Sequence, residues 1–112
     1  MRVLILEDEP ILAMDLEDIV ESRSGAECVV ADSVEAGLMG IERGVDFAML
    51  DIHLGGDGET SLPVAQELLR RRIPFCFISS RLDDLPSSFH RVPKVGKPFQ
   101  ARDIAGVLPA LA

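Results

Sequence analysis

The sequence has few of the features that mark nucleic-acid binding or membrane insertion. It carries 11 basic against 19 acidic side chains, a net charge of −8, and its one basic run is Arg70-Arg71-Arg72. Because affinity for DNA and RNA comes largely from clustered Lys and Arg, we expect no nucleic-acid partner. Apolar runs such as Val3–Leu6 are far shorter than the roughly 20 residues of a membrane span, and no signal-peptide core follows Met1-Arg2. We therefore expect a cytoplasmic protein without membrane contact.

Cysteine is scarce, and Trp and Tyr are absent. Cys28 and Cys76 each lie inside an apolar run, where a free Cys commonly packs as a small hydrophobic residue. The composition is not that of a secreted protein, so we expect no disulfide. Neither residue has a His or a third Cys nearby that would complete a metal site. With 112 residues, the chain is long enough for one packed core, and we expect one domain over residues 1–112.

Short apolar runs alternate with amphipathic segments along the chain. This is the pattern of βα units around a parallel sheet, so we expect an α/β fold with a doubly wound five-stranded sheet and helices on both faces. Of the orders that such a sheet can take, we expect the flavodoxin-like order 2-1-3-4-5. Pro86 and two serines leave room for only a short or frayed helix over Arg81–Arg91. Strands are expected at 2–6, 27–31, 47–50, 74–78 and 94–96, and helices at 10–22, 34–44, 62–71 and 101–111, the third turning Val64, Leu68 and Leu69 inward.

Polar residues interrupt this pattern just after four of the strands. The first strand is followed by Glu7-Asp8-Glu9, the third by Asp51, the fourth by Ser79-Ser80 and the fifth by Gly96-Lys97-Pro98. The carboxyl ends of parallel strands meet at one edge of the sheet, where ligands bind in open α/β folds. We therefore expect these residues to gather in one site.

The residue types of that site favour phosphoryl chemistry. Glu7, Asp8 and Asp51 would form an anionic pocket, and carboxylate oxygens are the ligands that Mg²⁺ prefers. Lys97 and the Ser79 hydroxyl would then offset charge and donate a hydrogen bond to a phosphoryl group. Asp51 is either a metal ligand only or the nucleophile that attacks phosphorus.

At this point the chain resembles the receiver domains of bacterial two-component response regulators. The resemblance covers essentially the whole chain. It rests on Val3–Glu9, Phe47–Asp51, Phe77–Ser80, Lys97–Phe99 and the βα alternation between them. It implies a signalling domain whose only catalysis is its own phosphotransfer and dephosphorylation. Its partners would be a histidine kinase or histidine phosphotransfer protein and an output protein that the sequence does not identify.

Carried over residue by residue, the resemblance assigns a role to each residue of the site. Asp51 would accept the phosphoryl group from a phosphohistidine. Asp8 and Asp51 would bind Mg²⁺, with Glu7 supporting it through water and the backbone carbonyl of His53 as a further ligand. Ser79 and Lys97 would hold the phosphoryl oxygens; the latter and Lys94 are the chain's two lysines, against nine arginines.

The chain departs from many receivers in three ways. The loop after Asp51 lacks a proline and contains Gly55-Gly56, which lengthens the entry to the third helix. Three residues before Lys97, where many receivers place an aromatic side chain that reports phosphorylation, this chain has Lys94. No effector domain follows in the sequence up to Ala112, so we expect output through protein contact, unless the chain is trimmed from a longer protein.

Other interpretations of the same residues remain open. A phosphohydrolase of the haloacid-dehalogenase type also uses an Asp nucleophile with Mg²⁺, but it needs an acid at the position of His53. A pseudo-receiver would bind partners without phosphorylation, although Asp8, Asp51 and Lys97 are all present. Taken singly, Glu7-Asp8-Glu9 could be a solvated helix start and Ser79 a turn residue, with Ser80 competing for its role.

Overall fold

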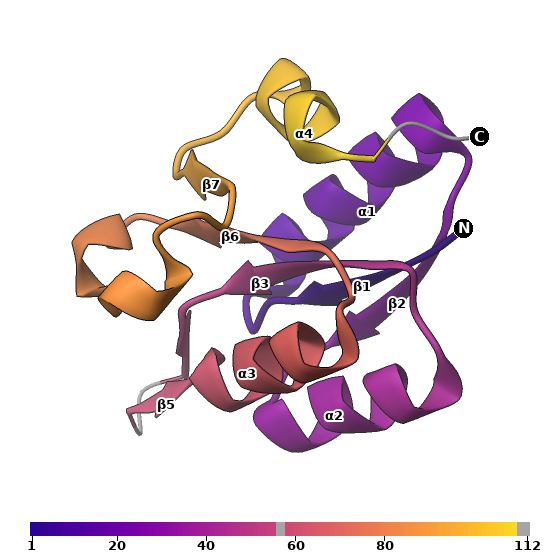
Figure 1. The fold of residues 1–112 in the computed structure, drawn as a ribbon. Helices are drawn as coiled ribbons and strands as arrows, with labels where there is room; N and C mark the ends of the chain where they lie inside the picture. Colours follow the sequence, from indigo (N-terminus) through magenta and orange to yellow (C-terminus); the bar gives the residue numbers. More distant parts are fainter. Residues whose placement is uncertain (56–57, 110–112) are drawn as a thin grey trace.

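The computed structural model describes residues 1–55 and 58–109 and contains a five-stranded parallel sheet (Figure 1). Its order is β2-β1-β3-β6-β7, which is the predicted order once two short strands outside the sheet are set aside. Every neighbouring pair in this sheet is parallel. The five strands are β1 (Arg2–Leu6), β2 (Glu27–Ala31), β3 (Phe47–Asp51), β6 (Phe75–Ser79) and β7 (Lys94–Gly96).

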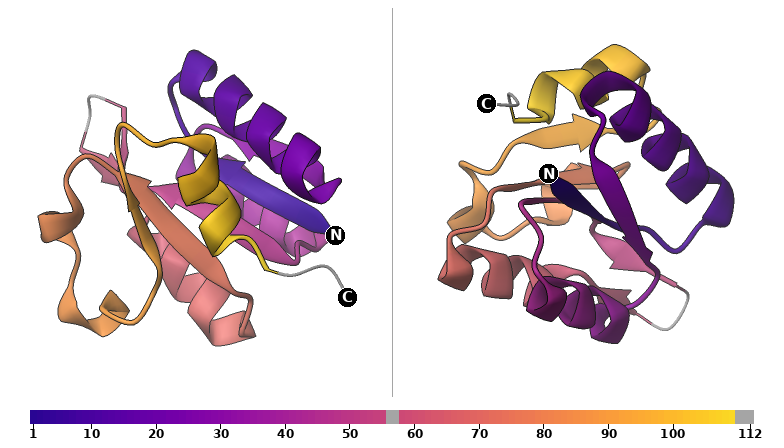
Figure 2. Two further views of the ribbon diagram at one scale, coloured as in Figure 1. Left: turned by 90° about the horizontal axis from the view of Figure 1, so that it is seen from above. Right: turned by 90° about the vertical axis from the view of Figure 1, so that its right-hand side faces the viewer.

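Helices cover both faces of the sheet, as Figure 2 shows. One face carries α1 (Pro10–Ser24) and α4 (Ala101–Val107), and the other carries α2 (Val34–Arg43) and α3 (Leu62–Arg71). The last helix is shorter than predicted, because Leu108 is extended ahead of Pro109, and a residue before proline disfavours the helical conformation. Positions 110 and 111 of the predicted helix lie outside the described residues. No helix in the described part of the chain has the length and apolar character needed to cross a membrane.

A hairpin that the sequence did not reveal follows β3. Its strands, β4 (His53–Leu54) and β5 (Glu59–Thr60), pair antiparallel outside the main sheet. Strands of two residues are too short to show an alternating pattern, so the sequence predicted only a turn-rich loop. The Glu59 carboxylate accepts a hydrogen bond from the backbone N–H of Val34 at 2.6 Å, which ties the hairpin to the first turn of α2. The Ser33 hydroxyl caps the same helix, because it accepts a hydrogen bond from the backbone N–H of Ala36.

The segment between β6 and β7 forms two single-turn 3-10 helices, in agreement with the expected short or frayed helix. They are η1 (Leu82–Asp84) and η2 (Ser87–Phe89), separated by Pro86. The ring of Phe89 is buried and packs edge-on against Phe77, with ring centroids 5.5 Å apart. This aromatic contact, together with Leu82 and Leu85 packed against the same core, holds the segment to the sheet.

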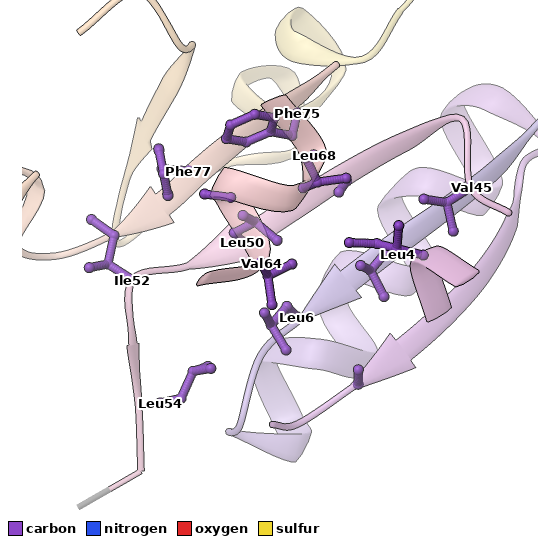
Figure 3. Packing of buried hydrophobic residues seen from close by; sticks show 14 of the residues in the cluster. Leu4, Leu6, Val45, Leu50, Ile52, Leu54, Val64, Leu68, Phe75 and Phe77 are labelled. Carbon is purple, nitrogen blue, oxygen red and sulfur yellow. The ribbon is translucent and has the colours of Figure 1, made fainter. Parts of the chain in front are cut away.

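Two apolar layers, one on each face of the sheet, form the core. Successive side chains of β1 point to opposite faces, so Leu4 and Leu6 join the layer beneath α2 and α3, while Val3 and Ile5 join the other. Figure 3 shows the first layer, where Leu4 and Leu6 lie near Leu50, Val64 and Leu68. The prediction that Leu69 points inward is wrong. Its side chain lies one residue round the helix from Leu68, and Leu69 is 48% exposed.

Candidate functional site

Strand register brings the polar residues of the site to one edge of the sheet. Asp51 and Ser79 are the last residues of β3 and β6, and Glu7 and Lys97 directly follow β1 and β7. Asp51 pairs in register with Ile78, and Ser79 pairs with Gly96. Because neighbouring strands end at matching heights, residues up to 90 positions apart in sequence become neighbours.

Three carboxylates lie together at this edge. Oxygens of Glu7, Asp8 and Asp51 lie within 4.8 Å of one another. Glu7 is 2% exposed and Asp51 8% exposed, so two of the three acids are buried. Buried carboxylates are costly unless they are paired or bound to a cation. An oxygen-only donor set of this kind fits a hard divalent cation such as Mg²⁺.

The ammonium of Lys97 reaches into the acidic cluster. Its Nζ lies 3.1 Å from Asp51 Oδ2 and 3.2 and 3.3 Å from the two oxygens of Glu7. Burial by itself would lower the pKa of Lys97, but the charges of Asp51 and Glu7 outweigh it and raise that pKa. The lysine therefore stays charged. Its contact with Glu7 was not among the expectations from sequence, which assigned Lys97 to phosphoryl oxygens alone.

The pKa of Glu7 is shifted by its place in this cluster. Burial raises the pKa of its carboxyl to about 8, and the neighbouring Asp51 adds to the increase, while Lys97 partly opposes it. Without a bound cation, Glu7 therefore binds its proton more tightly than an ordinary glutamate, and its carboxyl interacts directly with that of Asp51. A divalent cation at this position would displace that proton.

Asp8 is held from the opposite side by the hairpin loop. Its Oδ2 accepts a hydrogen bond from the backbone N–H of Gly55 at 2.7 Å. Gly55 has φ 73°, a conformation that favours glycine. Sequence reasoning took the glycine pair only as a sign of a longer loop, and missed that one of these residues contacts the site. The available signal was a glycine four residues after Asp51.

Ser79 is one of the residues that line a cavity of about 230 Å³ beside Asp8 and Asp51. The Ser79 hydroxyl is buried and accepts a hydrogen bond from the backbone N–H of Arg81 at 3.0 Å. His53 lines the cavity, and its side chain is half-buried. The role of its carbonyl as a ligand stays a prediction. The lining residues are Asp8, Glu9, Asp51, His53, Gly55, Ser79, Ser80, Arg81 and Lys97.

Lys94 occupies the position where many receivers carry an aromatic residue. Its ammonium donates to three backbone carbonyls, those of Phe89 at 3.1 Å, His90 at 2.9 Å and Val92 at 2.7 Å. These carbonyls lie at and after the end of η2, where a positive charge is favourable. Lys94 therefore fastens the segment between β6 and β7 to the edge strand.

No family model matches the chain. Among proteins of similar sequence, the Phyllosphere-induced regulator PhyR of Methylorubrum extorquens is 29% identical over 121 residues. The match takes in 96% of this chain and 42% of PhyR, so the chain spans less than half of that relative's length.

Solved structures agree over nearly the whole fold. SdrG from Sphingomonas melonis Fr1 is 39% identical, with a TM-score of 0.83 over 96% of this chain and 92% of SdrG. The BeF3-activated conformation of SdrG, from Pseudomonas melonis Fr1, gives a TM-score of 0.75 over 94% and 90%. The REC domain of the response regulator PhyR from Erythrobacter litoralis is 28% identical, with a TM-score of 0.82 over 95% and 84%. Together with the sheet order and the residues at its carboxyl edge, these similarities show that the chain belongs to the family of response regulator receiver domains.

Proposed function

We propose that this chain is a phosphoacceptor in a two-component phosphorelay. Asp51 takes a phosphoryl group from the phosphohistidine of a histidine kinase or histidine phosphotransfer protein, and the resulting change controls contacts with an output protein. The observation that carries this proposal is the position of Asp51. It is buried at the end of β3, 3.1 Å from the Lys97 ammonium and beside the carboxylates of Glu7 and Asp8.

The transfer itself needs a nucleophile and groups that offset charge. A carboxylate oxygen of Asp51 forms a bond to phosphorus, and the bond from phosphorus to the histidine nitrogen breaks. The electron pair of that bond stays on the imidazole, which takes up a proton from solvent. Lys97 already contacts Asp51, so its ammonium is in place to offset the negative charge on the transferred oxygens.

Ser79 would change partners during this step. Its hydroxyl now accepts from the N–H of Arg81, and that hydroxyl has one hydrogen to donate. A phosphoryl oxygen on Asp51 would be an acceptor stronger than any neutral group nearby, because it is charged. We expect Ser79 to turn toward it and to weaken the contact with Arg81.

The acidic cluster is the proposed Mg²⁺ site. Asp8 and Asp51 would hold the ion directly, Glu7 through water and His53 through its backbone carbonyl. A bound Mg²⁺ would neutralise charge on the phosphoryl oxygens. The clustering of three carboxylates beside a single lysine supports this assignment, since Lys97 alone does not offset their charge.

The similar protein SdrG also supports the proposal. The BeF3 group in its activated structure is a tetrahedral mimic of a phosphoryl group, and SdrG is 39% identical to this chain. We also propose that the chain acts in the cytoplasm, alongside its phosphohistidine donor.

Intact-mass spectrometry tests the proposal. The chain is incubated with acetyl phosphate and Mg²⁺, and we expect the mass to rise by one phosphoryl group. Asp51→Asn should show no increase, whereas Asp15→Asn, an exposed acid on α1, should behave like the unaltered chain. Labelling of Asp51→Asn at the normal rate would show that another residue is the nucleophile.

A further inference from the structure

An apolar groove of about 580 Å³ lies at the opposite end of the sheet from the acidic cluster. Its walls include Phe47 and Phe75, the first residues of β3 and β6, and Val107, the last residue of α4. β3 ends at Asp51, so the strand separates the groove from the candidate site by about 13 Å at roughly 3.3 Å per residue. A molecule in the groove would therefore not touch the phosphoacceptor.

The groove leaves apolar side chains in contact with water. Leu69, from the last turns of α3, lines it and is 48% exposed, and Val92 lines it from the segment before β7. The groove is open, unlike the closed cavities that bury most of a small ligand. Open apolar grooves of this kind suit the side chains of a partner protein.

Two arginines give the groove its charge. Arg72 and Arg91 line it, and none of the lining residues that the structure describes is acidic. Neither guanidinium has an ion pair or hydrogen bond with the described residues 1–55 and 58–109. In a chain with a net charge of −8, a groove with only positive charges stands out from the rest of the surface.

Arg72 also occupies an unfavourable backbone position. It caps the end of α3 with φ 60° and is the one non-glycine residue with a positive φ among those that the structure describes. The ends of α1 and α2 use Gly25 and Gly44 at positive φ instead. A side chain there costs about 1 kcal/mol relative to glycine. Helix capping therefore does not account for the guanidinium at the groove.

From this combination we infer that the groove is a docking surface for an acidic amphipathic segment of a partner protein. The apolar side chains of that segment would fill the groove between Phe47, Phe75 and Val107. Its Asp or Glu side chains would pair with Arg72 and Arg91. Docking of a carboxylate against a guanidinium can use two parallel hydrogen bonds, which adds geometric selectivity. The surface is distinct from the phosphoacceptor site and does not depend on the proposed phosphotransfer.

Nuclear magnetic resonance on the full ¹⁵N-labelled chain tests this inference. The probe is a synthetic helical peptide with leucines on one face and glutamates flanking them, and its matched control has lysines in place of the glutamates. We expect the acidic peptide to shift the amide signals of Phe47, Leu69 and Val92, and to bind at least tenfold more tightly than the basic peptide. Equal binding of the two peptides, shifts elsewhere, or no shifts at millimolar peptide would overturn the inference.

Three variants separate the docking role from folding. Arg72→Gly suits the left-handed backbone, so its melting temperature should stay equal or rise while the acidic peptide binds about two- to fivefold more weakly. Arg91→Gln should weaken binding to a similar extent. Arg23→Gln removes the same charge from the exposed end of α1 and should leave binding unchanged. Unchanged binding in both groove variants would contradict the inference. So would a mass in sedimentation that rises with concentration and falls in Arg72→Gly, because the occupant would then be a second copy.

Discussion

The Lys97 ammonium forms an ion pair with the Asp51 carboxylate, with 3.1 Å between Nζ and Oδ2. Asp51 ends β3 and Lys97 follows β7, and these two strands are not neighbours in the sheet. Only β6 separates β3 from β7, so a side chain as long as lysine spans the gap. The same ammonium also pairs with Glu7. One cation therefore serves two buried acids, and the site as it stands carries more negative than positive charge.

Glu7 should titrate far above an ordinary glutamate in the chain without metal. Burial and the adjacent Asp51 raise its pKa to about 8. Carbon-13 NMR of the side-chain carboxyls should show this titration directly. Asp51→Asn should lower the pKa of Glu7, because one of its neighbouring charges is gone. A Glu7 pKa near 4.5 in both proteins would show that the acids are not clustered in solution.

The same shift predicts how stability depends on pH. A carboxyl with a raised folded-state pKa lowers stability as pH rises through its unfolded value, 4.5, and the loss is complete above about 8. At about 1.4 kcal/mol per pKa unit, the loss from Glu7 is at most about 5 kcal/mol. In thermal melts with chelator, the melting temperature of Glu7→Gln relative to that of the unaltered chain should rise as the pH increases from 4.5 to about 8. Mg²⁺ should raise the melting temperature at pH 7, and a melt indifferent to both changes would contradict the prediction.

Ser79→Ala should separate phosphorylation from its consequence. The Ser79 hydroxyl contacts the Arg81 N–H, and we expect a phosphoryl mimic to draw that hydroxyl away. Amide hydrogen exchange should then quicken over residues 80–89 when BeF3 and Mg²⁺ are added. In Ser79→Ala this response should be lost while Asp51 still accepts phosphate. Ser80→Ala is the matched control and should respond normally; changes limited to the loop after Asp51 would rule the mechanism out.

Lys94→Met should loosen the segment that Lys94 fastens. The substitution keeps an unbranched side chain but removes three hydrogen bonds to the carbonyls of Phe89, His90 and Val92. Since the ammonium is only part-buried, we expect a loss of about 1 to 2 kcal/mol. Chemical denaturation measures it, and Lys94→Arg should lose less. Equal stability of all three proteins would show that the contacts between Lys94 and the carbonyls do not stabilise the fold.

His53 and Arg81 should govern how long the phosphoryl group persists. Both line the cavity over Asp51, the expected route of the water that hydrolyses a phosphoaspartate. We expect His53→Ala and Arg81→Ala each to change the lifetime of the phosphorylated chain by several-fold and its rate of formation by less. Timed mass spectra after removal of acetyl phosphate give the lifetime. Equal changes in both rates would remove this role.

Local pattern predicted most of the secondary structure. The alternation of apolar runs and amphipathic segments predicted the five strands and four helices, and α3 begins and ends where the pattern places it. The pattern failed where a tertiary contact outweighed it. The β4–β5 hairpin has two-residue strands and is tied to α2 by Glu59, and Leu69 has the residue type of a core position but lies on the open side of α3.

The sequence by itself determined the residue types of the site and the strand end at which each one stands, because both follow from runs of a few neighbouring residues. Tertiary structure alone decided which partner each side chain meets. Lys97 pairs with Glu7, which lies 90 positions away in sequence, and Asp8 accepts a hydrogen bond from the backbone N–H of Gly55. Lys94 binds backbone carbonyls at a position where many receivers carry an aromatic ring. Such contacts depend on strand register, burial and side-chain reach, and these exist only once the whole sheet has formed.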